Sequence, residues 1–203
     1  MGGATNITVP VVSKIYCFSS QTTLMVRRRP RLVNGGGFVV MNSNQNLVFK
    51  VDGCGILGIK GELILRDGDG APILFIRKKG GVVQALSAHN RWNSYLMDYE
   101  EPSKLVFSLR EPKLRLLTKN SIKISNDTDG KNKDWSFEVK GSFIKRACTI
   151  NDRRGNVVAQ VGLKEMVANK DFYHVVVQPG YDQAFVIGVI AILDNIHGES
   201  TRC

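Results

Sequence analysis

The sequence predicts a mainly β protein, an antiparallel sandwich or barrel that encloses one C-terminal helix. Short apolar segments of strand length fill most of its 203 residues. Turn residues separate these segments at short intervals, which is typical of antiparallel sheets and not of alternating β and α units. The longest apolar run, residues 184–193, has no polar face and is too short to span a bilayer. We therefore expect a buried helix in a β framework.

The strand candidates share alternating or continuous apolar residues rich in Val, Ile, Leu and Phe. In chain order they are residues 23–28, 38–41, 47–51, 62–65, 73–78, 95–97, 104–109, 113–117, 122–125, 135–139, 143–150, 157–161 and 173–178. No shift in composition marks a boundary between domains. We expect a flexible N-terminal segment over residues 1–15, a single domain over 16–198 and a tail over 199–203.

Three of the intervening turns repeat one pattern, beginning at Asn42, Asp67 and Asp152. The first side chain can cap its own backbone, and a glycine three places on can take a positive φ, so each predicts a tight hairpin. Gln45 replaces the glycine in the first copy and weakens it. A calcium loop over residues 67–70 is the alternative, but the further oxygen ligands and the late Glu of the common loop are missing.

Residues 183–196 break the two-residue alternation and predict the helix. Asp182 can cap its start and Gly198 can end it. A helix that is apolar on every side must be surrounded on every side. In a chain of strands the natural enclosure is a closed antiparallel barrel with the helix inside. A buried β-strand is the alternative, since Val and Ile also favour strands.

Charge and cysteine spacing narrow the classes of function. The chain has 28 Lys and Arg against 18 Asp and Glu, a net charge of +10. Such an excess indicates anionic partners: nucleic acid, anionic lipid or acidic protein. The four cysteines are far apart, so we expect no metal, no cofactor and no disulfide framework. Without a secretory signal, we expect an intracellular protein, cytoplasmic or membrane-peripheral, with the nucleus left open.

No catalytic motif is present. His89, His174 and His197 are scattered and lie in no recognisable nucleophile or metalloprotease motif. A cysteine such as Cys17 or Cys148 would be a nucleophile only with a base beside it in space. We expect a protein that is not an enzyme, with a hydrolase as the least favoured alternative.

Basic clusters are the positive functional signal. If they gather on one side of the domain, they would form a surface for anionic lipid headgroups. Each Lys or Arg would then contribute about 1 kcal/mol to the free energy of membrane binding. If they spread around it, they only keep the protein soluble. Nucleic acid is less favoured, because the aromatic residues that could stack on bases lie apart from the basic clusters. The candidate headgroup contacts are Arg27, Arg28, Arg29, Arg77, Lys78, Lys79, Lys113 and Arg115.

The order of several short motifs resembles the plant LURP-one-related family. They are Tyr16-Cys17, the segments 37–40 and 46–51, Leu65-Arg66-Asp67, the segments 70–74 and 77–79, the segment 139–143, and the segments 181–185 and 192–194. The family is similar in fold to tubby C-terminal domains and phospholipid scramblases. The resemblance implies a twelve-stranded antiparallel barrel around a hydrophobic C-terminal helix.

The resemblance implies less about function. The family is associated with plant defence, and tubby domains bind phosphoinositides. No stretch of this sequence matches the tubby lipid-contacting motif, and a shared fold does not transfer a site. We expect a non-enzymatic protein that binds anionic phospholipid (phosphoinositide) headgroups at a membrane surface. The alternative is a protein-interaction scaffold in defence signalling without lipid binding.

Overall fold

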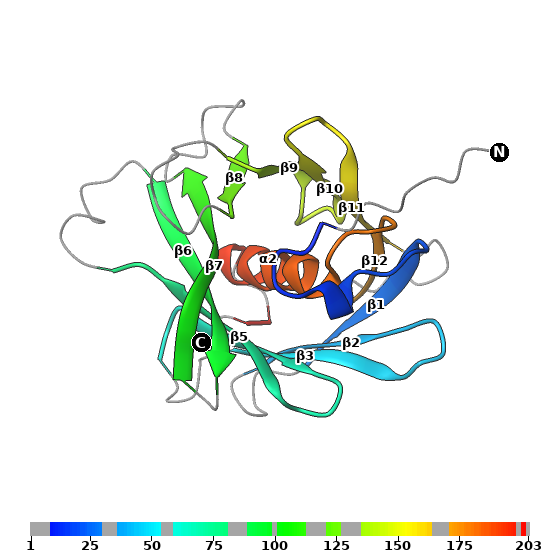
Figure 1. Ribbon diagram of the computed structural model, residues 1–203, viewed down its shortest axis with the longest axis horizontal. Helices are drawn as coiled ribbons and strands as arrows, with labels where there is room; N and C mark the ends of the chain where they lie inside the picture. The colour runs from blue at the N-terminus through cyan, green and yellow to red at the C-terminus, as the bar shows by residue number, and fades with distance from the viewer. Residues whose placement is uncertain are drawn as a thin grey trace.

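The protein is a closed antiparallel β-barrel around one helix (Figure 1). The computed structural model describes residues 9–29, 36–53, 59–80, 89–98, 101–112, 121–126, 135–163, 171–197 and 200–201. Within them, twelve strands follow chain order around the ring, and β1 pairs with β12 to close it. This confirms the expected fold.

The strands are short and each pairs with its sequence neighbours. Their bounds are β1 (Thr22–Arg28), β2 (Gly37–Met41), β3 (Leu47–Gly53), β4 (Glu62–Asp67), β5 (Pro72–Lys78), β6 (His89–Asp98), β7 (Glu101–Pro112), β8 (Ile122–Ser125), β9 (Phe137–Ser142), β10 (Ala147–Asp152), β11 (Val157–Gly162) and β12 (Phe172–Val177). A short 3-10 helix, η1 (Lys14–Tyr16), precedes them, and α2 (Gln183–Ile196) follows. The predicted strand over 113–117 lies outside the described residues.

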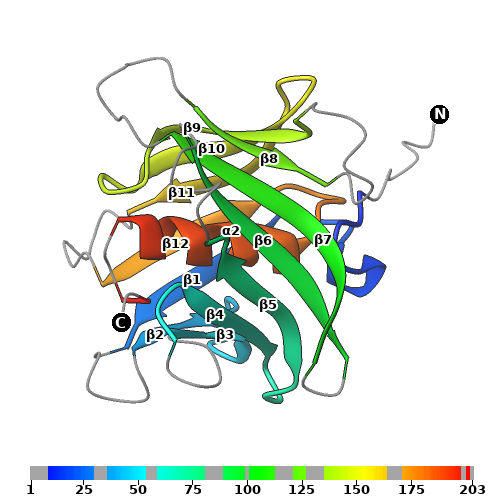
Figure 2. The ribbon, with the colours of Figure 1, turned by 90° about the vertical axis from the view of Figure 1, so that its left-hand side faces the viewer.

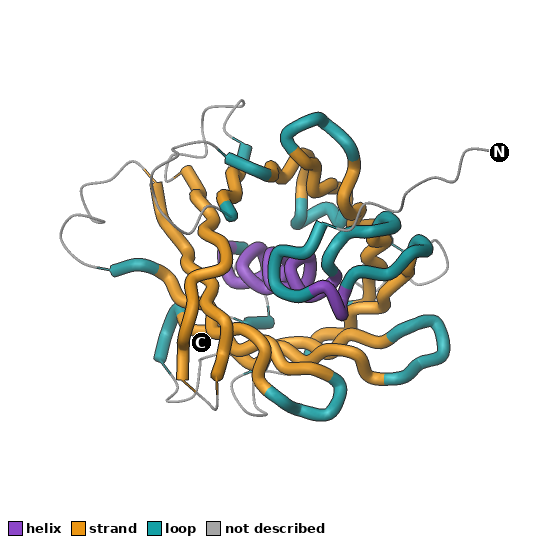
Figure 3. The backbone as a smooth tube through the Cα atoms, viewed as in Figure 1, coloured by secondary structure: helices purple, strands orange, loops and turns teal. Residues whose placement is uncertain are grey.

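The helix α2 fills the inside of the barrel, as Figures 2 and 3 show. Every residue from Gln183 to Asp194 is buried, so no side of the helix faces water. The ring of Phe185 packs against Phe107 and Phe137, at 5.1 and 4.7 Å between ring centroids. The helix predicted over 183–196 is confirmed, and the buried strand considered for this run is excluded.

Both ends of α2 hold a buried carboxylate with several donors. At the start, Asp182 caps the helix by accepting from the Phe185 backbone N–H (3.1 Å). Its other oxygen accepts from the backbone N–H groups of residues 11–13 at 2.7–3.1 Å, which holds these residues over this end of the helix. At the finish, Asp194 accepts from the Thr201 N–H (2.7 Å) and the Ser200 hydroxyl (3.1 Å). Chain segments outside the barrel thus donate hydrogen bonds to the carboxylates at both ends of its helix.

The three repeated turns form the predicted hairpins with one geometry. In each, the first side chain accepts from backbone N–H groups two and four residues on, as Asp67 does from Asp69 (3.1 Å) and Ala71 (2.8 Å). The fourth residue has positive φ in all three, including Gln45 at 63°. The Asn42 side chain therefore supports the turn even without the glycine.

The strand register defines two ends of the barrel. At one end β1 finishes at Arg28 and β5 finishes at Lys78, and Arg28 lies 3.8 Å from Asp194 at the finish of α2. We call this end the basic end. At the opposite end lie the three hairpins just described and the N-terminal segment 9–18.

The centre of α2 is a place where added volume cannot be accommodated. A Cβ on Gly188 would lie 3.2 Å from Leu74 Cδ1 and 3.3 Å from Phe107 Cζ. We expect Gly188→Val to lower the free energy of unfolding by about 1–3 kcal/mol, because overpacking a filled core forces strain. Ala147→Val, on the exposed face of β10, should change it by less than about 0.5 kcal/mol. Urea unfolding would measure both, and equal effects would contradict a tightly filled barrel.

Candidate functional site

A row of cations crosses the outer wall of the barrel on β1, β3 and β4. Core residues face inward from these strands, so their neighbours in sequence point outward. The register places Arg27 opposite Val39, Val39 opposite Lys50, and Lys50 opposite Arg66. Directly opposed residues lie on one face, so the three cations form one line across four strands. We call this line the basic row.

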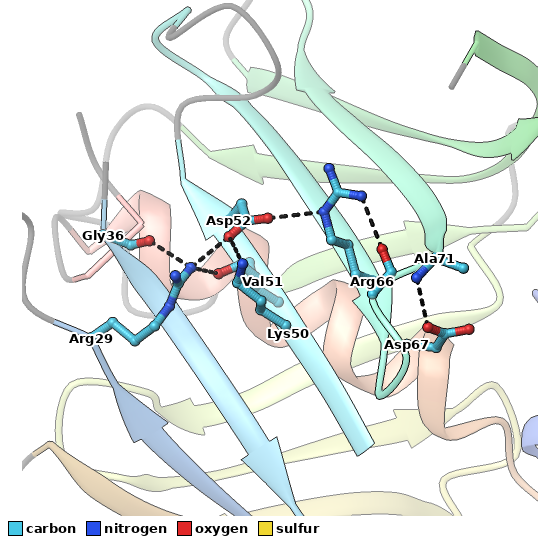
Figure 4. Close-up of polar contacts among 9 residues, drawn as sticks. Arg29, Gly36, Lys50, Val51, Asp52, Arg66, Asp67 and Ala71 are labelled. Atoms are coloured by element: carbon cyan, nitrogen blue, oxygen red, sulfur yellow. Dashed lines mark hydrogen bonds and ion pairs between the residues drawn. The ribbon is translucent and has the colours of Figure 1, made fainter. Parts of the chain in front are cut away.

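One carboxylate organises the row (Figure 4). Asp52 accepts a hydrogen bond from Arg29 Nη2 at 2.6 Å and from Arg66 Nε at 3.0 Å, and Lys50 Nζ lies at 3.2 Å. Arg29 also donates to the carbonyl oxygens of Gly36 (2.9 Å) and Val51 (2.8 Å). Three cations therefore share one anion, and the cluster keeps a positive charge. Each cation is held in place by its charge-assisted bonds.

A glycine leaves room for this arrangement. Gly37 has φ +111°, and a Cβ there would lie 2.0 Å from the Val51 oxygen and 2.8 Å from Arg29 Nη2. Any side chain at position 37 would therefore occupy the space through which the Arg29 guanidinium reaches β3.

Asp52 stays ionised because of its partners. Burial alone would raise the pKa of its carboxyl, but hydrogen bonds from Arg29, Lys50 and Arg66 outweigh burial and hold the pKa below its ordinary value. The carboxylate therefore offsets part of the positive charge of the row at neutral pH.

The structure separates the predicted triplet Arg27, Arg28 and Arg29. Arg27 and Arg29 point to the outer wall, whereas Arg28 points inward at the basic end. There Arg28 contacts Asp171 at 3.4 Å and the fully buried Asp194 at 3.8 Å. Arg28 therefore neutralises the finish of α2, and a bound headgroup would have to compete with two carboxylates for it.

The second predicted triplet lies at the basic end in exposed positions. β5 ends with Arg77 and Lys78, and Lys79 follows it; all three residues are exposed. The guanidinium carbon of Arg77 lies 5.4 Å from the centroid of the Tyr95 ring. Lys113 and Arg115 lie outside the described residues. β7 finishes at Pro112, which pairs with His89 at the basic end.

Sequence reasoning missed Lys50 and Arg66. Each is a single cation within a strand, and only the register between β3 and β4 brings them together. The alternation within each strand predicts that these side chains point outward. The sequence does not show which strands pair, or in which register.

The thiols that the structure describes are not activated. Burial raises the pKa of Cys17 and of Cys148 to about 11, so both are protonated at neutral pH. Within the described ranges, no group of His, Cys, Asp or Glu is arranged to hold a metal ion. In the same part of the chain, no helix has the length and apolarity needed to cross a bilayer.

A closed twelve-stranded barrel around a helix defines the structural class, and comparison with known proteins defines the family. The family model described as LURP-one-related matches residues 22–194, so the chain belongs to the LURP-one-related family. Protein LURP-one-related 6 of Arabidopsis thaliana is 54% identical over 95% of this chain and 98% of its own length. Protein LURP-one-related 16 of the same plant is 52% identical over the full length of both.

The fold has also been seen by crystallography. An X-ray structure of an Arabidopsis thaliana protein superposes with a TM-score of 0.69, covering 93% of this chain and 98% of the other. The two sequences are 24% identical, so this likeness concerns the fold alone.

The Asp52 cluster predicts a pH-dependent contribution to stability. We expect Asp52→Asn to lower the free energy of unfolding at neutral pH by about 1–2 kcal/mol, because charge-assisted hydrogen bonds are lost. A carboxyl with a lowered folded-state pKa stabilises the protein above its unfolded pKa, near 4, and loses this effect as pH falls through the folded-state pKa. The difference from wild type should therefore shrink in acid. Urea unfolding from pH 7 to pH 3 would measure it.

Asp69→Asn, at an exposed position in the β4–β5 hairpin, is the matched control and should have little effect at either pH. A difference between Asp52→Asn and wild type that stays constant down to pH 3 would contradict the assigned ion pairs.

Proposed function

We propose that this protein binds anionic phospholipid headgroups at a membrane surface and that it acts by binding, without catalysis. The basic row, with Arg29 beside it, carries the proposal. A phosphate group needs several donors at fixed positions, and Arg29, Lys50 and Arg66 are already held by their bonds to Asp52. Phosphoinositides present such phosphates at the cytoplasmic face of membranes. Plant defence, to which the family resemblance points, is the setting that we propose for this binding.

The exposed cations of the basic end add long-range attraction to the same ligand. Among the described residues, four carboxylates at this end are paired or buried. Asp52 and Asp171 form ion pairs, and Glu111 accepts a hydrogen bond from Asn90. Asp194 lies in the interior. Glu62 is half-buried. Within the described ranges, the exposed cations at this end include Lys60, Arg77, Lys78, Lys79, Arg110 and Lys145.

Reversing charge at the basic end should weaken membrane binding. We expect Arg77→Glu combined with Lys79→Glu to reduce affinity for phosphoinositide vesicles by at least about 2 kcal/mol, roughly thirtyfold, since each cation contributes about 1 kcal/mol. The measurement is co-sedimentation with neutral, phosphatidylserine and phosphoinositide vesicles at low and high salt. The effect should be larger at low salt, because salt screens these charges.

A control with the same change in net charge is available at the opposite end. Lys104 and Arg154 are both exposed, and Lys104→Glu with Arg154→Glu should leave binding close to that of wild type. Equal losses in the two double variants would show that only net charge matters. No preference of wild type for anionic over neutral vesicles would reject the proposal and favour a protein partner.

A further inference from the structure

Large apolar side chains are exposed among the cations of the basic end. Ile59, Ile144 and Leu163 are 47%, 52% and 48% exposed. They lie in three different connections, β3–β4, β9–β10 and β11–β12, all of which join strands at this end. In the sequence, each is followed directly by a lysine. A single exposed aliphatic residue is ordinary on a protein surface, and one beside a lysine also suits the boundary between lipid headgroups and acyl chains.

The β9–β10 turn is built to present its apolar residue. Arg146 N donates to the Phe143 carbonyl oxygen at 2.9 Å, so Ile144 and Lys145 are the central pair of a tight turn. Arg146 itself turns inward with φ +53° and is only 3% exposed. Its guanidinium lies between the rings of Phe143 and Tyr173, at 4.4 and 4.1 Å from their centroids. The base of the turn is anchored while its two central residues stay in water.

The β3–β4 turn is tied to the exposed triplet of β5. Glu62 N donates to the Ile59 carbonyl oxygen at 3.3 Å, which closes a turn over Lys60 and Gly61. The Gly61 carbonyl oxygen accepts from Lys78 N at 2.8 Å. Ile59 therefore directly precedes Lys60, in a turn that is bonded to Lys78 of β5.

Ile144 and Leu163 lie at the same rim, next to the neighbouring strands β10 and β11. β10 pairs with β11, and Cys148 lies opposite Val161 two residues before Leu163. The turn that carries Ile144 leads directly into β10. Ile59 belongs to another sector of the ring, so the apolar positions are distributed around the rim and not gathered in one spot.

We infer that the basic end docks end-on against an anionic bilayer and inserts Ile59, Ile144 and Leu163 below the headgroups, with their neighbouring cations on the phosphates. Charge complementarity selects a membrane as the occupant, because the exposed Lys60 and Lys145 directly follow Ile59 and Ile144, and a lysine also follows Leu163 in the sequence. Anchored turns lose little conformational entropy on insertion. This inference rests on the proposed headgroup binding, here through the cations at the basic end and not through Arg66, which bonds to the β4–β5 hairpin at the opposite end. It adds an orientation and a second, apolar source of affinity.

The test compares two double variants on phosphatidylserine and phosphoinositide vesicles at low and high salt. We expect Ile144→Ser with Leu163→Ser to weaken binding about tenfold or more, since both inserted side chains lose their apolar contact. Because apolar contact is not screened, the loss should be similar at both salt concentrations, unlike the loss from Arg77→Glu with Lys79→Glu. The control is Ile15→Ser with Leu47→Ser, exposed apolar positions at the opposite end.

A fluorescence measurement tests insertion directly. Brominated lipids should quench a tryptophan introduced by Ile144→Trp and leave one introduced by Ile15→Trp unaffected, after subtraction of the signal from native tryptophans. Wild-type affinity in Ile144→Ser with Leu163→Ser, or equal quenching at both sites, would overturn end-on insertion while headgroup binding by wild type survives. Failure of wild type to bind any anionic vesicle would overturn headgroup binding and insertion together.

Discussion

The structure depends on a helix that has no polar face. α2 is buried along nearly its whole length, so every side of it needs an apolar wall, and here the closed sheet supplies one. The sheet is closed by the pairing of its first strand, β1, with its last strand, β12. The buried polar ends of the helix then need partners, which Asp182 finds in residues 11–13 and Asp194 finds in Ser200, Thr201 and Arg28. Enclosing one helix therefore ties residues 11–13 and 200–201 to the barrel.

The same closure decides which cations can meet a ligand. Inside positions are occupied by the helix and its apolar neighbours, so alternation sends every second side chain outward. In β1 this alternation gives adjacent arginines opposite tasks: Arg28 compensates the buried Asp194, while Arg27 and Arg29 join the outer wall. Only two arginines of the triplet therefore contribute positive charge to the outer wall, and the single cations Lys50 and Arg66 add to it there.

The fold could be predicted from sequence further than the site could. The all-round apolarity of residues 183–196 requires an enclosure, and the Asp67 and Asp152 turns specify hairpins through short-range bonds. These signals are local, so a sequence displays them. The basic row depends on which strands are neighbours and on their register, both set by contacts between distant residues. Even the local rule that a glycine takes the positive φ in such a turn has an exception. Gln45 stands in that position, and the Asn42 side chain holds the turn without a glycine.

The two ends of the barrel are built differently. At the opposite end, short hairpins and the N-terminal segment make bonds to one another and cover the start of α2. At the basic end, the buried Arg146 between two aromatic rings and the Gly61 bond to β5 fix turns whose tips remain apolar and exposed. Rigid anchoring beneath the exposed Ile144 suits a surface that meets a bilayer, because the tip is presented for insertion at little cost in conformational entropy.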